Sequence, residues 1–121
     1  MIVVDADSCP VKREVYRVAK RYNLEVILVA ASWMQVPDDR RVRFILVRDK
    51  GKLDAADDRI VEEVAANDIV ITEDVHLASR CLDKRARVIS PRGRVFSRDS
   101  IGEAVATRDL LADLREAGVA T

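Results

Sequence analysis

Short apolar runs alternate with longer amphipathic segments along the whole chain. The apolar runs are rich in β-branched residues and predict five strands, at residues 2–4, 25–30, 42–47, 68–72 and 87–90. Unbroken runs of this kind are typical of parallel strands that helices cover on both faces. The segments with a helical period predict four helices, at residues 10–23, 54–66, 75–84 and 100–117. The pattern therefore favours an α/β fold, a three-layer αβα sandwich with a mainly parallel central sheet.

Cap and turn residues set the expected ends of these elements. Ser8 or Cys9 would cap the first helix, and Asn23 would close it. On that helix, Val18 and Tyr22 are expected to point inward with the other apolar residues. The predicted loops and turn lie at residues 31–41, 49–53 and 91–93.

The length of 121 residues predicts a single domain, residues 1–121. The 21 basic and 21 acidic side chains cancel, so net charge gives no argument for binding to nucleic acid or membrane. No apolar run approaches the roughly 20 residues of a transmembrane helix. Met1 leads directly into a strand, so we expect a cytoplasmic protein with reduced thiols and no membrane partner. A homodimer is compatible with the sequence, but nothing in the sequence requires one.

Three separate segments bring carboxylates to the carboxyl edge of the predicted sheet. Asp5 and Asp7 follow the first strand, and Asp74 follows the fourth. The third segment is the start of the second helix, which carries Asp54, Asp57 and Asp58. Each group has a simpler explanation, because acidic residues cap helices and complement the helix dipole. Capping does not account for their convergence at one edge, whereas a divalent cation does. Oxygen ligands without His or Cys favour Mg²⁺ or Mn²⁺ over zinc.

Basic residues gather after the acidic segments, with seven Lys or Arg side chains and one acid between positions 80 and 98. Most are expected to solvate the surface, but Arg92 and Arg94 in a Pro-Arg-Gly-Arg turn are candidates for binding phosphate. Lys12 is another, because a cation at a helix start opposes the helix dipole. Ser32 and Trp33 lie in a loop at the same edge, where Trp33 would either stack on a base or cover the core. A basic flank beside an acidic metal pocket suits a phosphodiester substrate.

With these motifs assembled, the chain resembles the uncharacterised bacterial YaiI/YqxD family, a PIN-like group, over nearly its full length. The resemblance rests on residues 5–12, 32–34, 54–58, 68–74, 77–78 and 91–93. The chain has Ser8 where the family commonly has Ala, and residues 49–54 form a slightly longer loop than the family's Asp-Lys-Gly-Phe-Asp. The longer loop leaves the role of Asp54 open. The resemblance implies a PIN-like fold.

The wider pattern is similar to PIN and NYN ribonucleases, and this likeness implies hydrolysis of RNA with Mg²⁺ or Mn²⁺. The acidic positions that match are Asp5, Asp57 or Asp58 or both, and Asp74. In the first hypothesis, Asp5, Asp58 and Asp74 bind one or two metal ions. Asp7 and Asp57 lie beside them, and Thr72 orients Asp74 by a hydrogen bond.

Two other functions stay open. Asp5-Ala6-Asp7 after an apolar strand resembles the haloacid-dehalogenase motif, in which the first Asp is a phosphorylated nucleophile. Cys9 stands where that motif usually has Thr or Val, and the chain is short for that superfamily. The remaining alternative is a non-catalytic module that binds nucleic acid or protein and keeps the acidic pocket as a relic.

Overall fold

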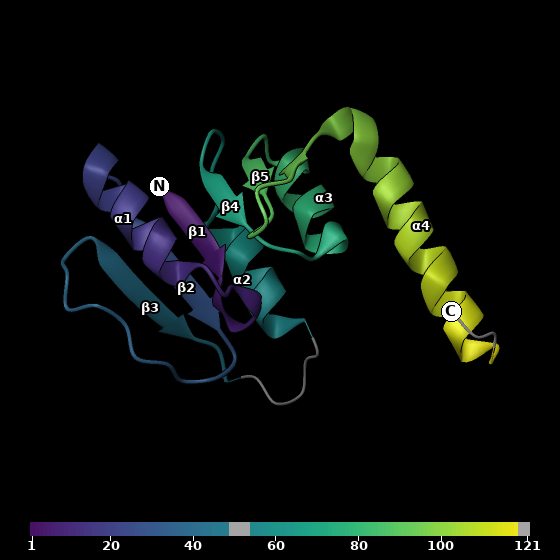
Figure 1. The fold of residues 1–121 in the computed structure, drawn as a ribbon, viewed down its shortest axis with the longest axis horizontal. Helices are drawn as coiled ribbons and strands as arrows, with labels where there is room; N and C mark the ends of the chain where they lie inside the picture. Colours follow the sequence, from purple (N-terminus) through teal and green to yellow (C-terminus); the bar gives the residue numbers. More distant parts are fainter. Residues whose placement is uncertain (49–53, 119–121) are drawn as a thin grey trace.

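Six strands form one sheet in the part of the chain that the computed structural model describes, residues 1–48 and 54–118 (Figure 1). They are β1 (Ile2–Asp5), β2 (Val26–Ala30), β3 (Val42–Leu46), β4 (Ile69–Ile71), β5 (Arg87–Ile89) and β6 (Val95–Phe96). Their order across the sheet is β3-β2-β1-β4-β5-β6, and all neighbours are parallel except β5 and β6. The prediction of a mainly parallel sheet is confirmed. The predicted loop 49–53 lies outside the described residues.

Helices cover both faces of this sheet. The helix α1 (Lys12–Tyr22) lies on one face, and α2 (Ala55–Glu63) and α3 (Val75–Asp83) lie on the other. The last helix, α4 (Arg98–Glu116), lies at the margin of the molecule and contacts α3. The predicted three-layer αβα arrangement is therefore confirmed. Within the described ranges, no helix is both long and apolar enough to cross a membrane.

The side chains of β1 alternate between the two faces of the sheet. Ile2 and Val4 pack on the α1 side, whereas Val3 packs on the side of α2 and α3. The same alternation carries Asp5 to the side of α2 and α3. Because β4 runs parallel to β1 with Val3 opposite Val70, Thr72 emerges on the same side as Asp5.

A short 3₁₀ helix that the sequence did not predict, η1 (Ala6–Ser8), follows β1. The backbone N–H of Cys9 donates to the carbonyl of Ala6 at 3.4 Å, and this turn delays the start of α1 to Lys12. The predicted cap by Ser8 or Cys9 is wrong, because Val11 occupies the cap position and no side chain bonds there.

The far end of α1 agrees with the prediction in its backbone but not in its side chains. Asn23 closes the helix in the left-handed conformation, with φ 55°. Tyr22 is 64% exposed and Val18 is half-exposed, so the prediction that both point inward is wrong. The reason is that α1 buries only the narrow stripe of Val15 and Ala19. Val18 instead borders an apolar hollow over the uncovered part of β4 and β5.

The second helix is shorter than predicted and ends at Glu63 instead of Ala66. Val64 is extended and buried, and the carboxylate of Asp68 accepts a hydrogen bond from the backbone N–H of Ala65 at 2.9 Å. This local bond favours a turn over another helical turn.

The segment after β5 also differs from the prediction. Two residues pair with β5 as the antiparallel strand β6, a run too short to recognise by alternation. The last helix then begins at Arg98 instead of Ser100, with Ser97 as its cap and a 3.3 Å bond from the N–H of Ser100 to the Ser97 hydroxyl. No residue of α4 is fully buried, and Ile101 packs against the α2–α3 side of the core.

Candidate functional site

The site lies where the strand order reverses, at the carboxyl ends of β1 and β4. The chain places β2 and β3 on one side of β1 and returns through α2 to place β4 on the other. In open α/β sheets, ligands bind in the crevice outside the strands at this switch point. The strand register brings Asp5 and Thr72 to this crevice.

Thr72 connects two of the predicted site residues. Its buried hydroxyl donates to Asp5 Oδ2 at 2.8 Å and accepts the backbone N–H of Asp74 at 3.0 Å. The carboxylate of Asp74 caps α3, since its Oδ1 accepts the N–H groups of His76 at 2.9 Å and Leu77 at 3.2 Å. The capping explanation for Asp74 is thus confirmed, and the same turn holds its carboxylate at the strand end.

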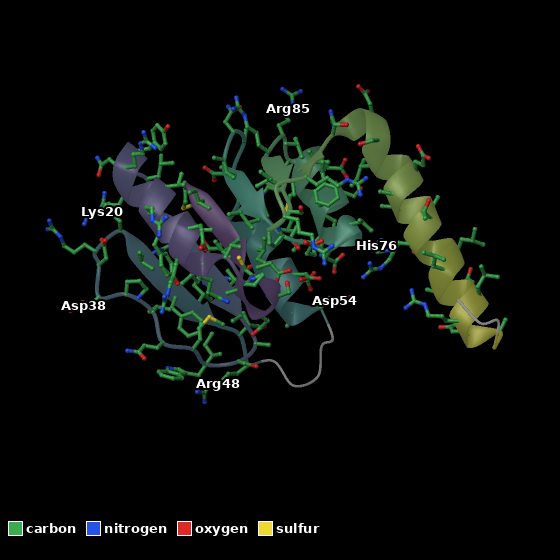
Figure 2. The ribbon with its side chains drawn as sticks, viewed as in Figure 1. Lys20, Asp38, Arg48, Asp54, His76 and Arg85 are labelled. Carbon is green, nitrogen blue, oxygen red and sulfur yellow. The ribbon has the colours of Figure 1, made fainter. Side chains whose placement is uncertain are left out.

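Asp57 comes from α2 and faces the same crevice. It lines a hollow of about 320 Å³ with Asp54, Asp74 and Arg80. Burial, together with the neighbouring charges of Asp74, Asp5 and Asp54, raises the pKa of Asp57 to about 6, and the charge of Arg80 acts in the opposite direction. Figure 2 shows Asp54 and His76 on the same side of the molecule, at the starts of α2 and α3.

The charge of Asp5 is also disfavoured. Burial raises the pKa of Asp5 above its ordinary value, and the neighbouring charges of Asp74 and Asp7 add to this effect. Hydrogen bonds from Thr72 and Ser8 act in the opposite direction, the second with Ser8 Oγ at 3.3 Å from Asp5 Oδ2. The crevice is therefore a place where anionic carboxylates repel each other in a partly dry environment.

Asp58 has different neighbours from Asp57. Its Oδ1 pairs with Nη1 of Arg80 at 2.9 Å, and the side chain lines a second hollow beside the end of β3, with Val47 and Arg59. Asp57 therefore faces the crevice that contains Asp5 and Asp74. Asp58, the next residue of the helix, faces the other hollow. The assignment of Asp58 as a metal ligand stays a prediction.

Asp7 fastens the neighbouring loop to the site. Its Oδ2 accepts the backbone N–H of Ala31 at 2.6 Å, just before Ser32 and Trp33. Trp33 is 73% exposed, so it does not cover the core, and the alternative that it stacks on a base stays a prediction. Asp54 occupies the cap position of α2 without a capping hydrogen bond from its side chain.

The three predicted basic residues are placed differently from one another. Lys12 Nζ donates to the carbonyl of Cys9 at 2.5 Å, at the edge where η1 ends. Arg92 is almost fully exposed, with its Nε 3.9 Å from the carboxylate of Glu73, next to Asp74. The guanidinium of Arg94 instead lies 5.6 Å from the centre of the Phe96 ring, and its side chain lines a hollow beside α4. Of the three, Arg92 therefore lies beside the residue that precedes Asp74, and Lys12 lies just after η1, which follows the end of β1.

The donor set suits a hard cation, although the side chains are not gathered around one point. Across residues 1–48 and 54–118, no three carboxylate, imidazole or thiol groups are grouped closely enough to hold a metal ion. One oxygen of Asp5 and one of Asp74 accept protein hydrogen bonds, while no described residue donates one to Asp57. The remaining oxygens of these three carboxylates match the ligands that Mg²⁺ and Mn²⁺ prefer. A cation would also relieve their repulsion, so the chemistry of the residues fits the predicted metal.

Sequence reasoning missed two contributors to this site. Arg80 holds Asp58 and offsets the charge at Asp57, but nothing in its helical position marks it as different from other surface cations. Ser8 bonds to Asp5, and its place three residues after Asp5 was the available signal.

The chain matches known sequences over almost its whole length. The family model described as "Uncharacterized BCR, YaiI/YqxD family" matches residues 3–121. The UPF0178 protein of Rhodospirillum centenum is 51% identical over 115 residues, which cover 95% of this chain and 73% of that protein. The UPF0178 protein of Paramagnetospirillum magneticum is 49% identical, covering 99% of this chain and 78% of that protein. The UPF0178 protein of Brucella ovis is 50% identical, covering 99% of this chain and 74% of that protein. No solved structure matches the chain.

Proposed function

The chain belongs to the YaiI/YqxD family, and we propose that it is a nuclease that hydrolyses phosphodiester bonds in RNA with Mg²⁺ or Mn²⁺. The observation that carries this proposal is that Asp5, Asp57 and Asp74 come from three separate segments to the switch point of the sheet, near enough for the charges of Asp5 and Asp74 to raise the pKa of Asp57. These residues come from a strand end, a helix start and a second strand end, and the charge of Asp57 is coupled to both others. Helix capping explains why an Asp stands at position 74. It does not explain the positions of Asp5 and Asp57.

The carboxylates of Asp5, Asp57 and Asp74 would bind the cation, and hydrogen bonds from neighbouring residues would fix the positions of two of them. When bound, the cation would activate water and neutralise charge on the scissile phosphate. Thr72 fixes Asp5 through its 2.8 Å hydrogen bond, and the cap of α3 fixes Asp74. Asp57, with no hydrogen bond from the described residues, would turn toward the cation as it binds.

The residues around the crevice support a nucleic acid as the substrate. Arg92 projects from the turn after β5 beside Glu73, and Lys12 lies at the start of α1. Their charges would attract the phosphates on either side of the cleaved bond. The exposed indole of Trp33 offers an apolar face on which an unpaired base would stack.

Calorimetric titration with Mn²⁺ tests the metal site directly. We expect the wild type to bind Mn²⁺ and each of Asp5→Asn, Asp57→Asn and Asp74→Asn to weaken binding at least tenfold, because each removes a charged oxygen ligand. Asp58→Asn separates the two helix positions, and a smaller effect than that of Asp57→Asn is expected because Asp58 pairs with Arg80. Asp113→Asn on the exposed part of α4 is the charge-matched control.

Cleavage of structured and single-stranded RNA then tests the activity. We expect Mn²⁺-dependent cleavage that EDTA stops and that Asp57→Asn reduces by at least a hundredfold, since the metal site would be incomplete. Absence of Mn²⁺ binding up to millimolar concentration, with RNA present, would refute the proposal. Formation of a stable beryllofluoride adduct at Asp5 would favour the phosphotransfer alternative instead.

A further inference from the structure

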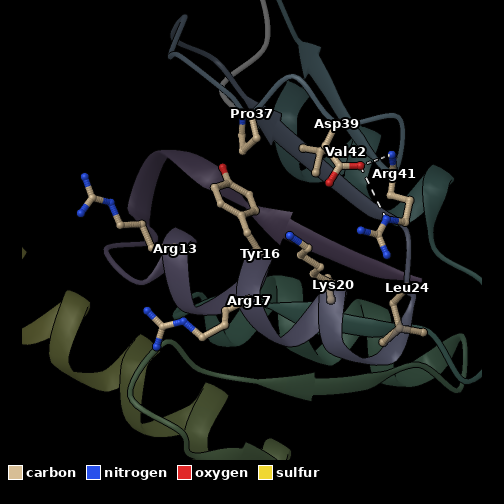
Figure 3. A pocket seen from close by; sticks show the side chains of 10 residues that line it. Arg13, Tyr16, Arg17, Lys20, Leu24, Pro37, Asp39, Arg41 and Val42 are labelled. Atoms are coloured by element: carbon tan, nitrogen blue, oxygen red, sulfur yellow. Dashed lines mark hydrogen bonds and ion pairs between the residues drawn. The ribbon is translucent and has the colours of Figure 1, made fainter.

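A separate hollow lies on the other face of the sheet, between α1 and the segment that leads into β3. Its volume is about 260 Å³. Figure 3 shows the side chains around it, with Asp39 and Arg41 paired at one end. We call it the basic hollow, and its charged and polar lining consists of Arg13, Arg17, Lys20, Arg41, Asp39 and Tyr16.

The charges of the basic hollow do not balance. Arg41 pairs with Asp39, its Nε lying 3.5 Å from Oδ1. A backbone hydrogen bond from Arg41 lowers the pKa of Asp39, and the charges of Arg41 and Lys20 add to this effect. Within the described ranges, Arg13, Arg17 and Lys20 form no ion pair. A hollow with three cations that lack an ion-pair partner attracts an anion.

A buried hydroxyl gives a second, independent indication. In the described part of the chain, the Tyr16 hydroxyl is the one buried side-chain polar atom without a hydrogen-bond partner. Figure 3 shows this hydroxyl pointing toward Pro37 at the side of the hollow, and the ammonium of Lys20 directed toward the Tyr16 ring. Buried donors normally have an acceptor. An oxygen-rich ligand would satisfy this donor once the Tyr16 side chain turned into the hollow, because the hydroxyl has almost no accessible surface in its present position.

The positions of the cations along α1 suggest what kind of anion fits. Arg13, Arg17 and Lys20 are spaced four and three residues apart, so they follow one side of the helix. At 1.5 Å per residue this row is about 10 Å long, enough for about two or three consecutive phosphates of a strand. The helix begins at Lys12, soon after the end of β1 that carries Asp5, and Figure 2 shows Lys20 on the far side of the molecule from Asp54 and His76. The row therefore leads away from the crevice.

We propose that the basic hollow binds backbone phosphates of the RNA strand whose scissile bond lies at the acidic crevice. This inference rests on the proposed function for its choice of ligand and adds the path of the strand. The guanidinium groups of Arg13 and Arg17 would contact successive phosphates, and Lys20 and Tyr16 would hold the phosphate that enters the hollow. The bound strand would thus follow α1 from its first turn to its last.

Fluorescence anisotropy with a fluorescein-labelled oligouridylate tests this path in EDTA, where cleavage does not interfere. The double variant Arg13→Gln/Arg17→Gln is compared with Arg87→Gln/Arg115→Gln, which removes the same charge from exposed positions away from α1 and outside the hollow. We expect the first pair to weaken binding about tenfold or more. The slope of log affinity against log salt should fall in magnitude by about 1.4, roughly 0.7 for each lost phosphate contact. The control pair should leave both quantities nearly unchanged.

Several results would overturn the inference. They are equal losses for the two double variants, no salt-dependent binding by the wild type, and equally tight binding of polyglutamate. Displacement of the strand by inorganic phosphate or uridine monophosphate, beyond the effect of ionic strength, would assign the hollow to a small ligand instead.

Cleavage assays separate this inference from the proposed function. If Arg13→Gln/Arg17→Gln cleaves RNA with an unchanged KM, the strand path is wrong while the nuclease stands. If the wild type with Mn²⁺ cleaves no RNA but the hollow variant still loses binding relative to its control, the nuclease is wrong while the phosphate-binding surface stands. The variant Asp5→Asn should lose cleavage and keep binding in EDTA.

Discussion

Two hydroxyl groups on opposite faces of the sheet show how differently the two candidate surfaces are built. The Thr72 hydroxyl donates to Asp5, 67 residues away in the chain, and also accepts the N–H of Asp74. The Tyr16 hydroxyl is buried as well, but no described residue accepts its hydrogen. The acidic crevice is thus fixed by hydrogen bonds within the protein, whereas the basic hollow keeps a donor for something outside it.

The charged side chains of the two regions differ in the same way as the two hydroxyl groups. In the crevice, the carboxylates are crowded and are held in place by Thr72, Ser8 and the cap of α3. In the hollow, three cations of α1 have no ion-pair partner among the described residues. A repelling acidic cluster with fixed geometry suits a small cation that requires defined ligand positions. A row of cations on long, flexible side chains suits a polymer whose phosphates need only be attracted.

Breaking the internal link in the crevice should have the largest effect on stability. Thr72→Val keeps the shape of the side chain and removes the donor to Asp5. Because a hydrogen bond to a charged group contributes about 1.5–3 kcal/mol, we expect the free energy of unfolding to fall by about 2 kcal/mol near pH 7. The loss should shrink as pH falls and Asp5 becomes protonated, since the donor favours the charged carboxylate. Urea unfolding over a pH series measures both effects.

The control for this change is Thr107→Val on the exposed side of α4. It makes the same substitution without a buried partner and should change stability by less than about 0.5 kcal/mol. Equal effects of the two variants would show that the loss comes from β-branched packing and not from the link between Asp5 and Asp74.

Removing one crowded charge should stabilise the protein. The folded-state pKa of Asp57, about 6, lies above its ordinary value of 3.8, so the folded protein binds a proton more readily than the unfolded chain. Stability attributable to this group is therefore present below about pH 4 and is lost as pH rises through 6. The shift corresponds to about 3 kcal/mol, which solvent access to the partly buried side chain reduces to about 1 kcal/mol.

We therefore expect Asp57→Asn to unfold at a higher temperature than the wild type at pH 7 in EDTA. The gain should disappear near pH 4, because both proteins are then neutral at this position. Asp113→Asn should show no such pH-dependent gain. If the Asp57→Asn variant is more stable than the wild type and also fails to bind Mn²⁺, the repulsion among the carboxylates of the crevice lowers stability but serves cation binding.

Much of the crevice was predictable because it depends on strand ends and alternation. The apolar runs predict the sheet, and the parallel ends bring Asp5 and Asp74 to one edge. The choice between Asp57 and Asp58 was not predictable, because neighbouring helix positions differ by 100° and the orientation of α2 depends on packing. The cap of α3 by Asp74 was predictable from its place before Val75.

The basic hollow could not be predicted in the same way. The cations on α1 have the pattern of any solvated helix face, and Arg41 joins them from a separate segment. Only the fold shows that the Tyr16 hydroxyl is buried without an acceptor. The strand β6 was missed for a related reason, because its two residues gain their pairing from β5 and not from a pattern of their own.

The smallest expected effect tests the other hydroxyl of the comparison. Tyr16→Phe removes a buried donor that has no partner among the described residues, so it should raise the free energy of unfolding by about 0.5 kcal/mol instead of lowering it. Tyr22→Phe is the matched control, because the Tyr22 side chain is exposed and its hydroxyl is hydrated in both states.

Thermal unfolding without ligand measures the change in stability. Anisotropy with oligouridylate should show about threefold weaker binding for Tyr16→Phe alone. A loss of stability of about 1 kcal/mol or more would mean that the hydroxyl already has an acceptor in the free protein. The Tyr16 hydroxyl would then be hydrogen-bonded within the protein, as the Thr72 hydroxyl is in the crevice. The argument that the basic hollow binds a ligand would rest on its unpaired cations alone.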